Sequence, residues 1–357
     1  MRKIVLTACA VTAVTALAAC GGGSGGGGQA AGGGADNSPL IGSDYPRSDT
    51  DFWNAYIRYT PDEAKSLGIA NLKTTNSEND VAKLTANVQT LLSEGVKGVV
   101  MAPQDTAAIA PTLSQLEAKK IPVVTIDTRP DTGNVAMVVR ADNRAYGEKA
   151  CQFLGTKLSG QGKVVMLQGD VSSINGRDRT DSFNECMQKS FPGVQVFGEP
   201  SKWDGALAAS QLQTALAANP DVRGVYMQSS FALAGTLQVL KQKGLLLPPS
   251  DPKHVFVVSN DGIPEELKDI GAGQIDATVS QPADLYAKYG LFYVQQALAG
   301  KTFSPGKTDH DSTIIQVRPG VLEDQLSAPL VTIDGGAIGG AATLKYDDKS
   351  LWGNNIS

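Results

Sequence analysis

The stretch VKGVVMAPQDTAAIAPTLSQLEAKKIPVVTID, from Val96 to Asp127, contains two short apolar runs with a helical pattern between them. The runs Val96–Ala102 and Ile121–Asp127 are rich in β-branched residues, which is typical of strands buried on both faces of a parallel sheet. Between them, apolar residues recur at helical spacing, at Ile109, Leu113 and Leu116. The stretch therefore predicts a strand–helix–strand unit.

The same alternation continues along the chain. Further apolar runs lie at 163–168, 224–228 and 255–259, with helical patterns between them. Repeated units of this kind build parallel sheets with helices on both faces, so we predict an α/β fold of two Rossmann-like lobes. The expected bounds are 40–141 plus 282–312 for the first lobe, and 142–281 plus 313–357, which includes the C-terminal tail, for the second.

The composition excludes several classes of protein. Of 357 residues, 41% are hydrophobic and 19% are charged, which is too apolar for a disordered chain. The formal net charge of −5 argues against binding nucleic acid through a basic surface. The only histidines are His254 and His310, which argues against a histidine metal site or a Ser-His-Asp triad. We expect no metal, no cofactor and no enzymatic activity.

The N-terminus has the layout of a secretory signal. Arg2 and Lys3 precede an apolar run, and Leu17-Ala18-Ala19-Cys20 resembles a bacterial lipobox. We expect a signal peptide at 1–19, a lipidated Cys20 and a flexible Gly-rich tether at 20–38. A plain signal peptide with a chance cysteine is the alternative. The prediction is an extracytoplasmic protein, held to the bacterial cell membrane by its lipid.

Two further cysteines, Cys151 and Cys186, fall on the predicted helices that flank the strand at 163–168. Because an extracytoplasmic compartment permits disulfides, we predict a bridge between them. Two buried free thiols are the alternative.

Polar and aromatic side chains follow the predicted strands. Open α/β sheets bind ligands beyond the carboxyl ends of their strands. The candidates at those positions are Phe52, Trp53, Asp127, Trp203, Asp261 and Gln281, with Asn175 and Arg179 in the segment after the strand at 163–168. Aromatic faces beside carboxylates, amides and an arginine suit a sugar, because its C–H faces stack on rings and its hydroxyls form several hydrogen bonds.

Several short motifs occur in a set order along the chain. They are Asp51-Phe52-Trp53, Ile121–Asp127, Ala141-Asp142-Asn143, Asn175–Phe183, Val257–Gly262, Ala277–Gln281 and Leu351–Asn354. Together they resemble the motifs of type I periplasmic binding proteins of the ribose and galactose group, which serve sugar ABC transporters. The resemblance covers about Leu40 to about Val317 and implies two lobes joined by a three-strand hinge.

The resemblance also implies roles for the candidate residues. Asp127, Asp261 and Gln281 would bind sugar hydroxyls, Arg179 would donate to ring or hydroxyl oxygens, and Phe52, Trp53 and Trp203 would sandwich the ring. Two segments depart from the family, since Ala102-Pro103 stands where Asn-Pro is common and Gln228-Ser229-Ser230 where Gln-Asn-Asp is common. The ligand therefore stays open among pentoses, hexoses and polyols.

Some features have plainer interpretations. Trp203 could be a core residue instead of a site residue, Arg177 is interpreted as a solvated or ion-paired surface group, and Trp352 as a packing anchor. We interpret Asp309-His310-Asp311 as an exposed hinge crossing and the Gly-rich piece at 335–340 as a loop.

The function expected from these features is that of a monomeric receptor. It would capture a monosaccharide or sugar alcohol by hinge closure and deliver it to an ABC permease and its ATPase. One alternative is a receptor that presents a sugar or a quorum-type molecule to a sensor kinase or chemoreceptor. Another is a secreted carbohydrate-active enzyme, in which Asp127 and Asp261 would do acid/base work.

Overall fold

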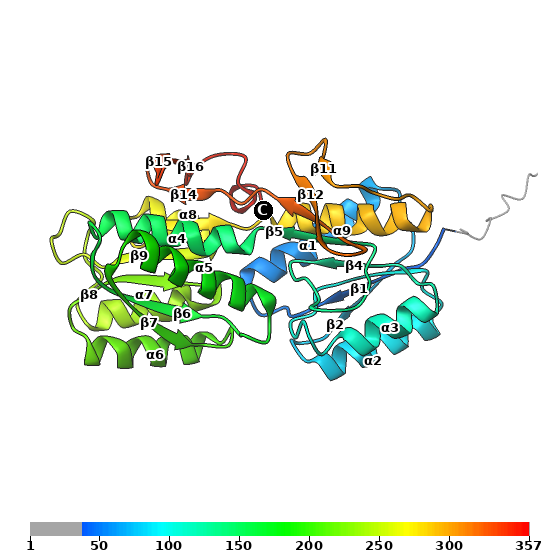
Figure 1. The fold of residues 1–357 in the computed structure, drawn as a ribbon, viewed down its shortest axis with the longest axis horizontal. Helices are drawn as coiled ribbons and strands as arrows, with labels where there is room; N and C mark the ends of the chain where they lie inside the picture. Colours follow the sequence, from blue (N-terminus) through cyan, green and yellow to red (C-terminus); the bar gives the residue numbers. More distant parts are fainter. Residues whose placement is uncertain (1–37, 357) are drawn as a thin grey trace, which may run out of the picture. The chain divides into compact units, whose positions relative to one another are not determined.

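The computed structural model describes residues 38–356, so the predictions on the signal peptide, Cys20 and most of the tether lie outside it. Figure 1 shows two β-sheets in this part of the chain, each with helices on both faces. We call each sheet with its helices a lobe. The two-lobed α/β architecture predicted from the apolar runs is confirmed.

The first lobe is built on a mostly parallel sheet. Its strands are β1 (Ile41–Tyr45), β2 (Leu72–Asn76), β3 (Gly98–Met101), β4 (Val123–Ile126), β5 (Met137–Ala141), β11 (Gly306–Lys307), β12 (Thr313–Arg318) and β13 (Val321–Leu326). They lie in the spatial order β11-β12-β13-β5-β4-β3-β1-β2. Strand β13 pairs parallel with β5, whereas β12 pairs antiparallel with both β11 and β13.

Four helices cover this sheet: α1 (Asp51–Ser66), α2 (Val81–Ser93), α3 (Ala110–Ala118) and α9 (Ala283–Leu298). Successive residues of β3 face opposite sides of the sheet. Val100 packs in the cluster that holds the apolar residues of α1 and α9, whereas Val99 and Met101 pack with those of α2 and α3. This two-sided burial explains why the strand at Val96–Ala102 is apolar without alternation.

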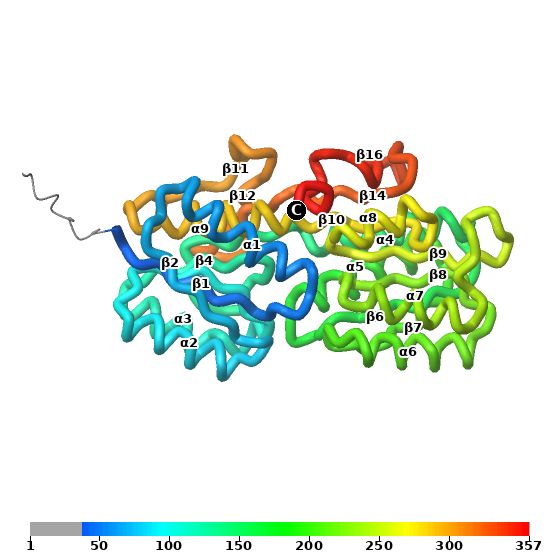
Figure 2. Tube along the Cα trace, turned by 180° about the vertical axis from the view of Figure 1, so that it is seen from behind, coloured from blue at the N-terminus to red at the C-terminus, as the bar shows by residue number. Residues whose placement is uncertain are grey.

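The second lobe follows the same plan. Its strands are β6 (Gln161–Gln168), β7 (Gly193–Pro200), β8 (Val222–Met227), β9 (Phe256–Asp261), β10 (Ala277–Ser280), β14 (Leu330–Thr332), β15 (Gly336–Ile338) and β16 (Ala341–Lys345), in the spatial order β15-β16-β14-β10-β9-β8-β6-β7. Its helices are α4 (Asn143–Lys157), α5 (Ile174–Ser190), α6 (Gly205–Ala218), α7 (Leu233–Gln242) and α8 (Pro264–Gly271), with 3₁₀ turns η1 (Ser230–Ala232) and η2 (Trp352–Asn354). Figure 2 shows α6, α7 and α8 of this lobe from the opposite side.

The chain crosses between the lobes three times within the described residues, after β5, after β10 and after β13. The predicted start of the second part of lobe 2 at residue 313 is wrong. Residues 313–326 form β12 and β13 of the first sheet, because β13 completes that sheet by pairing with β5. The crossing lies at 327–329, and Asp309-His310-Asp311 lies in the connection between β11 and β12 instead of at a hinge crossing.

Two further predictions concern the second lobe. A disulfide joins Cys151 on α4 to Cys186 on α5, with Cα atoms 6.2 Å apart, so the predicted bridge is confirmed. The Gly-rich tail is not a plain loop as predicted, because β14 pairs with β10 and the hairpin β15–β16 extends the sheet from there.

Candidate functional site

The eight predicted site residues line one cavity, although they come from six separate segments of both lobes. Phe52 and Trp53 begin α1, Asp127 follows β4, Asn175 and Arg179 lie on α5, Trp203 precedes α6, Asp261 ends β9, and Gln281 follows β10. Five of the six segments lie at or beyond the ends of strands, and this explains why the eight residues meet at one edge of the two sheets.

Asp127 is the buried carboxylate that the first lobe contributes. It follows β4 with a φ of 61°, and its Oδ1 accepts from Nε2 of Gln281 at 2.9 Å. Burial raises the pKa of Asp127 to about 6, although the charges of Arg179 and Arg140 lower it. A carboxylate in this setting has free acceptor capacity and little solvent, which suits hydrogen bonds from ligand hydroxyls.

Asp261 is the buried carboxylate that the second lobe contributes to the cavity. Its Oδ2 accepts from Ser229 Oγ at 2.6 Å and from both N and Oγ of Ser230 at 2.8 and 2.7 Å. Burial raises its pKa, and the charge of Arg179 and the serine hydrogen bonds lower it. The two serines, which depart from the family's Asn-Asp, thus orient one oxygen of this carboxylate and leave Oδ1 for other donors.

The guanidinium of Arg179 is held by protein acceptors. Its Nε donates to Asn143 Oδ1 and its Nη2 to Gln281 Oε1, both at 2.6 Å, and its Nη1 donates to the carbonyl oxygen of Gln228. These bonds use three of its five N–H groups. The group also lies 4.8 Å from the ring centroid of Tyr146 and 5.7 Å from that of Trp203. Arg179 is therefore fixed in position before any ligand contact is made.

Aromatic rings from both lobes complete the cavity. Phe52 and Trp53 are 3% and 7% exposed and meet edge to face at 5.2 Å. Trp203 meets Phe231 edge to face at 5.8 Å, and its ring lies so close to Gly169 that a Cβ there would come within 2.0 Å of it. Trp203 lines the cavity, which favours the site interpretation over the core interpretation.

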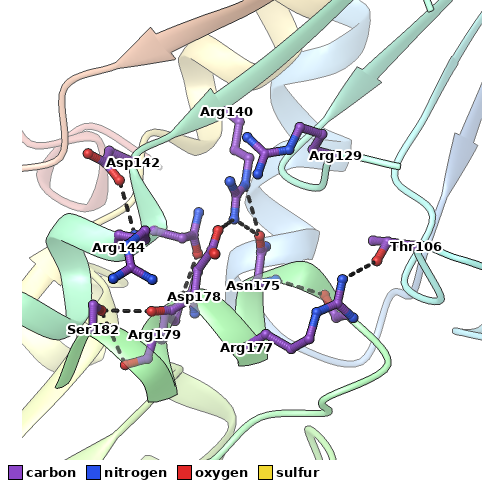
Figure 3. A network of polar contacts seen from close by, with 12 residues as sticks. Thr106, Arg129, Arg140, Asp142, Arg144, Asn175, Arg177, Asp178, Arg179 and Ser182 are labelled. Atoms are coloured by element: carbon purple, nitrogen blue, oxygen red, sulfur yellow. Dashed lines mark hydrogen bonds and ion pairs between the residues drawn. The ribbon is translucent and has the colours of Figure 1, made fainter. Parts of the chain in front are cut away.

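Asn175 lines the cavity, but both ends of its amide bind the protein. Its Oδ1 accepts from Nε and Nη2 of Arg140 at 3.0 and 2.9 Å, and its Nδ2 donates to the carbonyl oxygen of Asp127 at 3.2 Å. Arg140 is 2% exposed and also pairs with Asp178 at 2.6 Å (Figure 3). Asn175 therefore connects α5 of the second lobe to β5 and to the end of β4 in the first.

Arg177 connects the lobes outside the cavity. Its Nη2 pairs with Asp131 at 2.6 Å and donates to Thr106 Oγ1 at 3.2 Å, the second bond being visible in Figure 3. Thr106 in turn donates from its backbone N to the carbonyl oxygen of Ser172 at 3.3 Å. The ion-paired interpretation of Arg177 is confirmed, and its partner lies on the other lobe.

Five further residues line the cavity and are not among those predicted from the sequence: Arg47, Thr50, Gln104, Ser229 and Phe231. Gln104 and Ser229 follow β3 and β8, so the strand-exit rule could have found them. Thr50 is the N-cap of α1 and accepts from Trp53 N. Arg47 carries no sequence signal, yet it pairs with Asp49 and donates to the carbonyl oxygen of Trp203 at 3.1 Å.

His310 is engaged within the first lobe. Its ring stacks on Tyr289 at 3.7 Å, and its Nε2 lies 2.8 Å from Asp324 Oδ2. Within residues 38–356, no group of three or more His, Cys, Asp or Glu side chains is placed to hold a metal ion.

Comparison with known proteins agrees with this fold. The periplasmic binding protein domain family matches residues 41–302, and the chain belongs to this family. It is 30% identical to the ribose import binding protein RbsB of Salmonella typhimurium, over 67% of this chain and 78% of that protein. It is 23% identical to a xylitol-binding protein of Mycolicibacterium smegmatis, over 71% of this chain and 69% of that one.

A solved structure is similar as well. An ABC transporter solute binding protein from Mycobacterium smegmatis with bound glycerol is 27% identical and superposes with a TM-score of 0.69, covering 75% of this chain and 90% of that one. These relatives are binding proteins.

Proposed function

We propose that this chain is the solute receptor of an ABC importer and that it binds a neutral polyhydroxylated ligand, a monosaccharide or a sugar alcohol. The main support for this proposal is that two buried carboxylates, a fixed guanidinium and aromatic rings from both lobes line the same cavity. The names of the relatives, which include ribose, xylitol and bound glycerol, support the same ligand class.

The polar groups favour a ligand rich in hydroxyl donors. Arg179 already has three protein acceptors, and Arg47 is paired with Asp49, whereas Asp261 keeps one carboxylate oxygen for a ligand. A carboxylated or phosphorylated sugar would bring its charge next to Asp127 and Asp261 without an unengaged cation to meet it. We therefore expect neutral ligands to bind and anionic ones to be excluded.

Contacts that join the two lobes support the proposal that the protein closes around its ligand. Arg47 reaches the backbone of Trp203, Arg177 reaches Asp131, and Asn175 reaches Asp127. A ligand that touches both carboxylates binds only the arrangement in which these contacts exist, and so it shifts the population toward the closed form. The closed form would then dock on a membrane permease as a monomer.

Retention at a membrane is a further part of the proposal. None of the helices formed by residues 38–356 is both long and apolar enough to cross a membrane. We infer that a lipid on Cys20 holds the protein to the cell membrane. Metabolic labelling with a radioactive fatty acid tests this, since the full-length protein should take up label and the Cys20→Ala variant should not.

A thermal-shift screen tests the ligand class. Pentoses, hexoses, sugar alcohols and their phosphorylated or carboxylated derivatives are added one at a time, and a ligand that binds only the folded protein raises Tm. At least one neutral compound should raise Tm by several degrees and the anionic derivatives should not. No shift with any compound would contradict the proposal.

A further inference from the structure

The C-terminal 3₁₀ turn η2 packs against the second lobe directly behind the cavity. Trp352 is 3% exposed, and its Nε1 donates to the carbonyl oxygen of Asp261 at 3.1 Å. The next residue, Gly353, lies so close to the segment after β9 that an added Cβ would be 2.2 Å from the carbonyl oxygen of Gly262. Only glycine fits there without displacing the backbone next to Asp261.

The same turn packs against the first lobe. The indole of Trp352 meets the ring of Phe52 edge to face, with centroids 6.0 Å apart. Its carbonyl oxygen accepts from the hydroxyl of Tyr59 on α1 at 3.4 Å. Trp352 does not line the cavity, yet it contacts the back of one cavity residue from each lobe.

The backbone that Trp352 supports has an unusual conformation. Asp261 has a φ of 115°, a region that non-glycine residues seldom adopt and that persists only where surrounding contacts impose it. Its carbonyl oxygen accepts from two donors, Gln281 N at 2.9 Å and Trp352 Nε1. The indole is thus one of two groups that fix the peptide carrying the Asp261 carboxylate.

We propose that Trp352 is a positioning residue for ligand binding, which sets the Phe52 ring and the Asp261 carboxylate relative to each other in the closed arrangement. The inference rests on the proposed function and assigns a role in it to the C-terminal tail. Ligand binding that brings Phe52 and Asp261 together also packs both residues against the indole of Trp352. The C-terminal tail therefore responds to binding although it does not contact the ligand.

Two substitutions separate the hydrogen bond from the packing. Trp352→Phe keeps a ring against Phe52 and removes the donor to Asp261, and Trp352→Ala removes both. Tyr346→Ala is the matched control, because Tyr346 is an aromatic residue of the same tail that packs against Gly271 of the second lobe.

Calorimetric titration at 25 °C with the sugar or polyol found in the screen gives the decisive comparison. Loss of one hydrogen bond should weaken binding about three- to tenfold in Trp352→Phe, and Trp352→Ala should weaken it more. Tyr346→Ala should lower Tm but leave affinity within about twofold of wild type. Wild-type affinity in folded Trp352→Phe would overturn the inference.

A spectroscopic readout distinguishes positioning from a merely structural role. The chain has three tryptophans, and Trp53 and Trp203 line the cavity. In ¹H–¹⁵N spectra the indole signal of Trp352, assigned by its loss in Trp352→Phe, should shift at ligand saturation. An unmoved Trp352 signal, while the signals of the two cavity tryptophans shift, would contradict the inference.

Failure of the proposed function is a separate outcome, seen as a wild-type protein that binds no compound of the screen. Hydrogen exchange of the ligand-free protein then still tests the role of Trp352. Trp352→Phe should speed amide exchange in the peptides that cover 51–60 and 256–263, and unchanged exchange in both would overturn the inference.

Discussion

Gln281 donates from Nε2 to Oδ1 of Asp127 at 2.9 Å, and this bond joins the start of the second crossing to the end of β4. The other end of the same amide accepts from Nη2 of Arg179 at 2.6 Å. One side chain therefore sits between the carboxylate of the first lobe and the guanidinium of the second. Its position therefore determines where both charged groups lie in the cavity.

Removing this amide should weaken ligand binding. In Gln281→Ala, Asp127 and Arg179 each lose a buried partner, and hydrogen bonds to charged groups contribute about 1.5–3 kcal/mol each. We expect affinity to fall at least tenfold by calorimetric titration. Gln316→Ala, at an exposed position of β12, serves as the control and should bind like wild type. Equal affinities of the two variants would refute this role of Gln281.

The aromatic face of Trp203 should contribute to ligand affinity. Trp203→Phe keeps an aromatic surface over Arg179, so we expect a loss of affinity of no more than about fivefold. Trp203→Ala removes the stacking surface, and aromatic and cation–π contacts of about 0.5–2 kcal/mol each predict a loss of about tenfold or more. Titration of both variants measures the difference. If alanine and phenylalanine bound equally well, Trp203 would be a packing residue only.

Asp127 should make stability and binding respond oppositely to pH. Its pKa is about 6 in the folded protein and has an ordinary value of 3.8, so the folded state holds the proton more tightly. The protein therefore loses stability as pH rises from about 4 to about 6. Each unit of difference between the two pKa values changes the free energy of unfolding by about 1.4 kcal/mol. Asp127→Asn should raise the free energy of unfolding by up to about 3 kcal/mol at pH 7 and by nothing below pH 4, measured by urea titration.

Binding should instead weaken as pH falls through about 6, because a protonated Asp127 accepts fewer hydrogen bonds from hydroxyls. Titrations between pH 5 and 8 follow this change. The Asp127→Asn variant should bind far more weakly and lose most of the pH dependence over this range. A wild-type affinity that does not change between pH 5 and 8 would show that Asp127 does not contact the ligand.

The disulfide should contribute to stability without affecting the cavity. Cys151 and Cys186 are 35 residues apart and join α4 to α5, and a loop of this size predicts about 3–4 kcal/mol. The double variant Cys151→Ala, Cys186→Ala should unfold at a lower urea concentration and bind ligand within about twofold of wild type. A large loss of affinity would mean that the bridge positions Arg179 on α5.

The sequence predicts the central strands and most of the site for one physical reason. Strands buried on both faces are mostly apolar, as in Val123–Ile126, and the residue after such a strand lies at the edge of the sheet that borders the cavity, as Asp127 does. The outer strands are different. Strand β12 is only partly buried, and β13 buries charged residues such as Asp324, so their residue pattern does not reveal which sheet they join. That choice depends on pairing with β5, a long-range contact.

Contacts between the lobes also could not be predicted. Asn175 and Arg177 are close in sequence, yet one binds Arg140 and Asp127 and the other binds Asp131. The relative position of the sheets of the two lobes determines these partners. The C-terminal motif around Trp352 resembles the family, but its contact with Asp261 depends on the chain returning between the lobes.

Calorimetric titration of the wild-type protein and of the Asp127→Ala and Asp261→Ala variants tests capture between the lobes most directly. The ligand is the compound that raises Tm most among neutral pentoses, hexoses and sugar alcohols. We predict one site per chain in the wild type and a loss of at least a hundredfold in each variant, because each lobe supplies one carboxylate. A wild type that bound none of these compounds, or a variant that bound as tightly as the wild type, would contradict capture between the lobes.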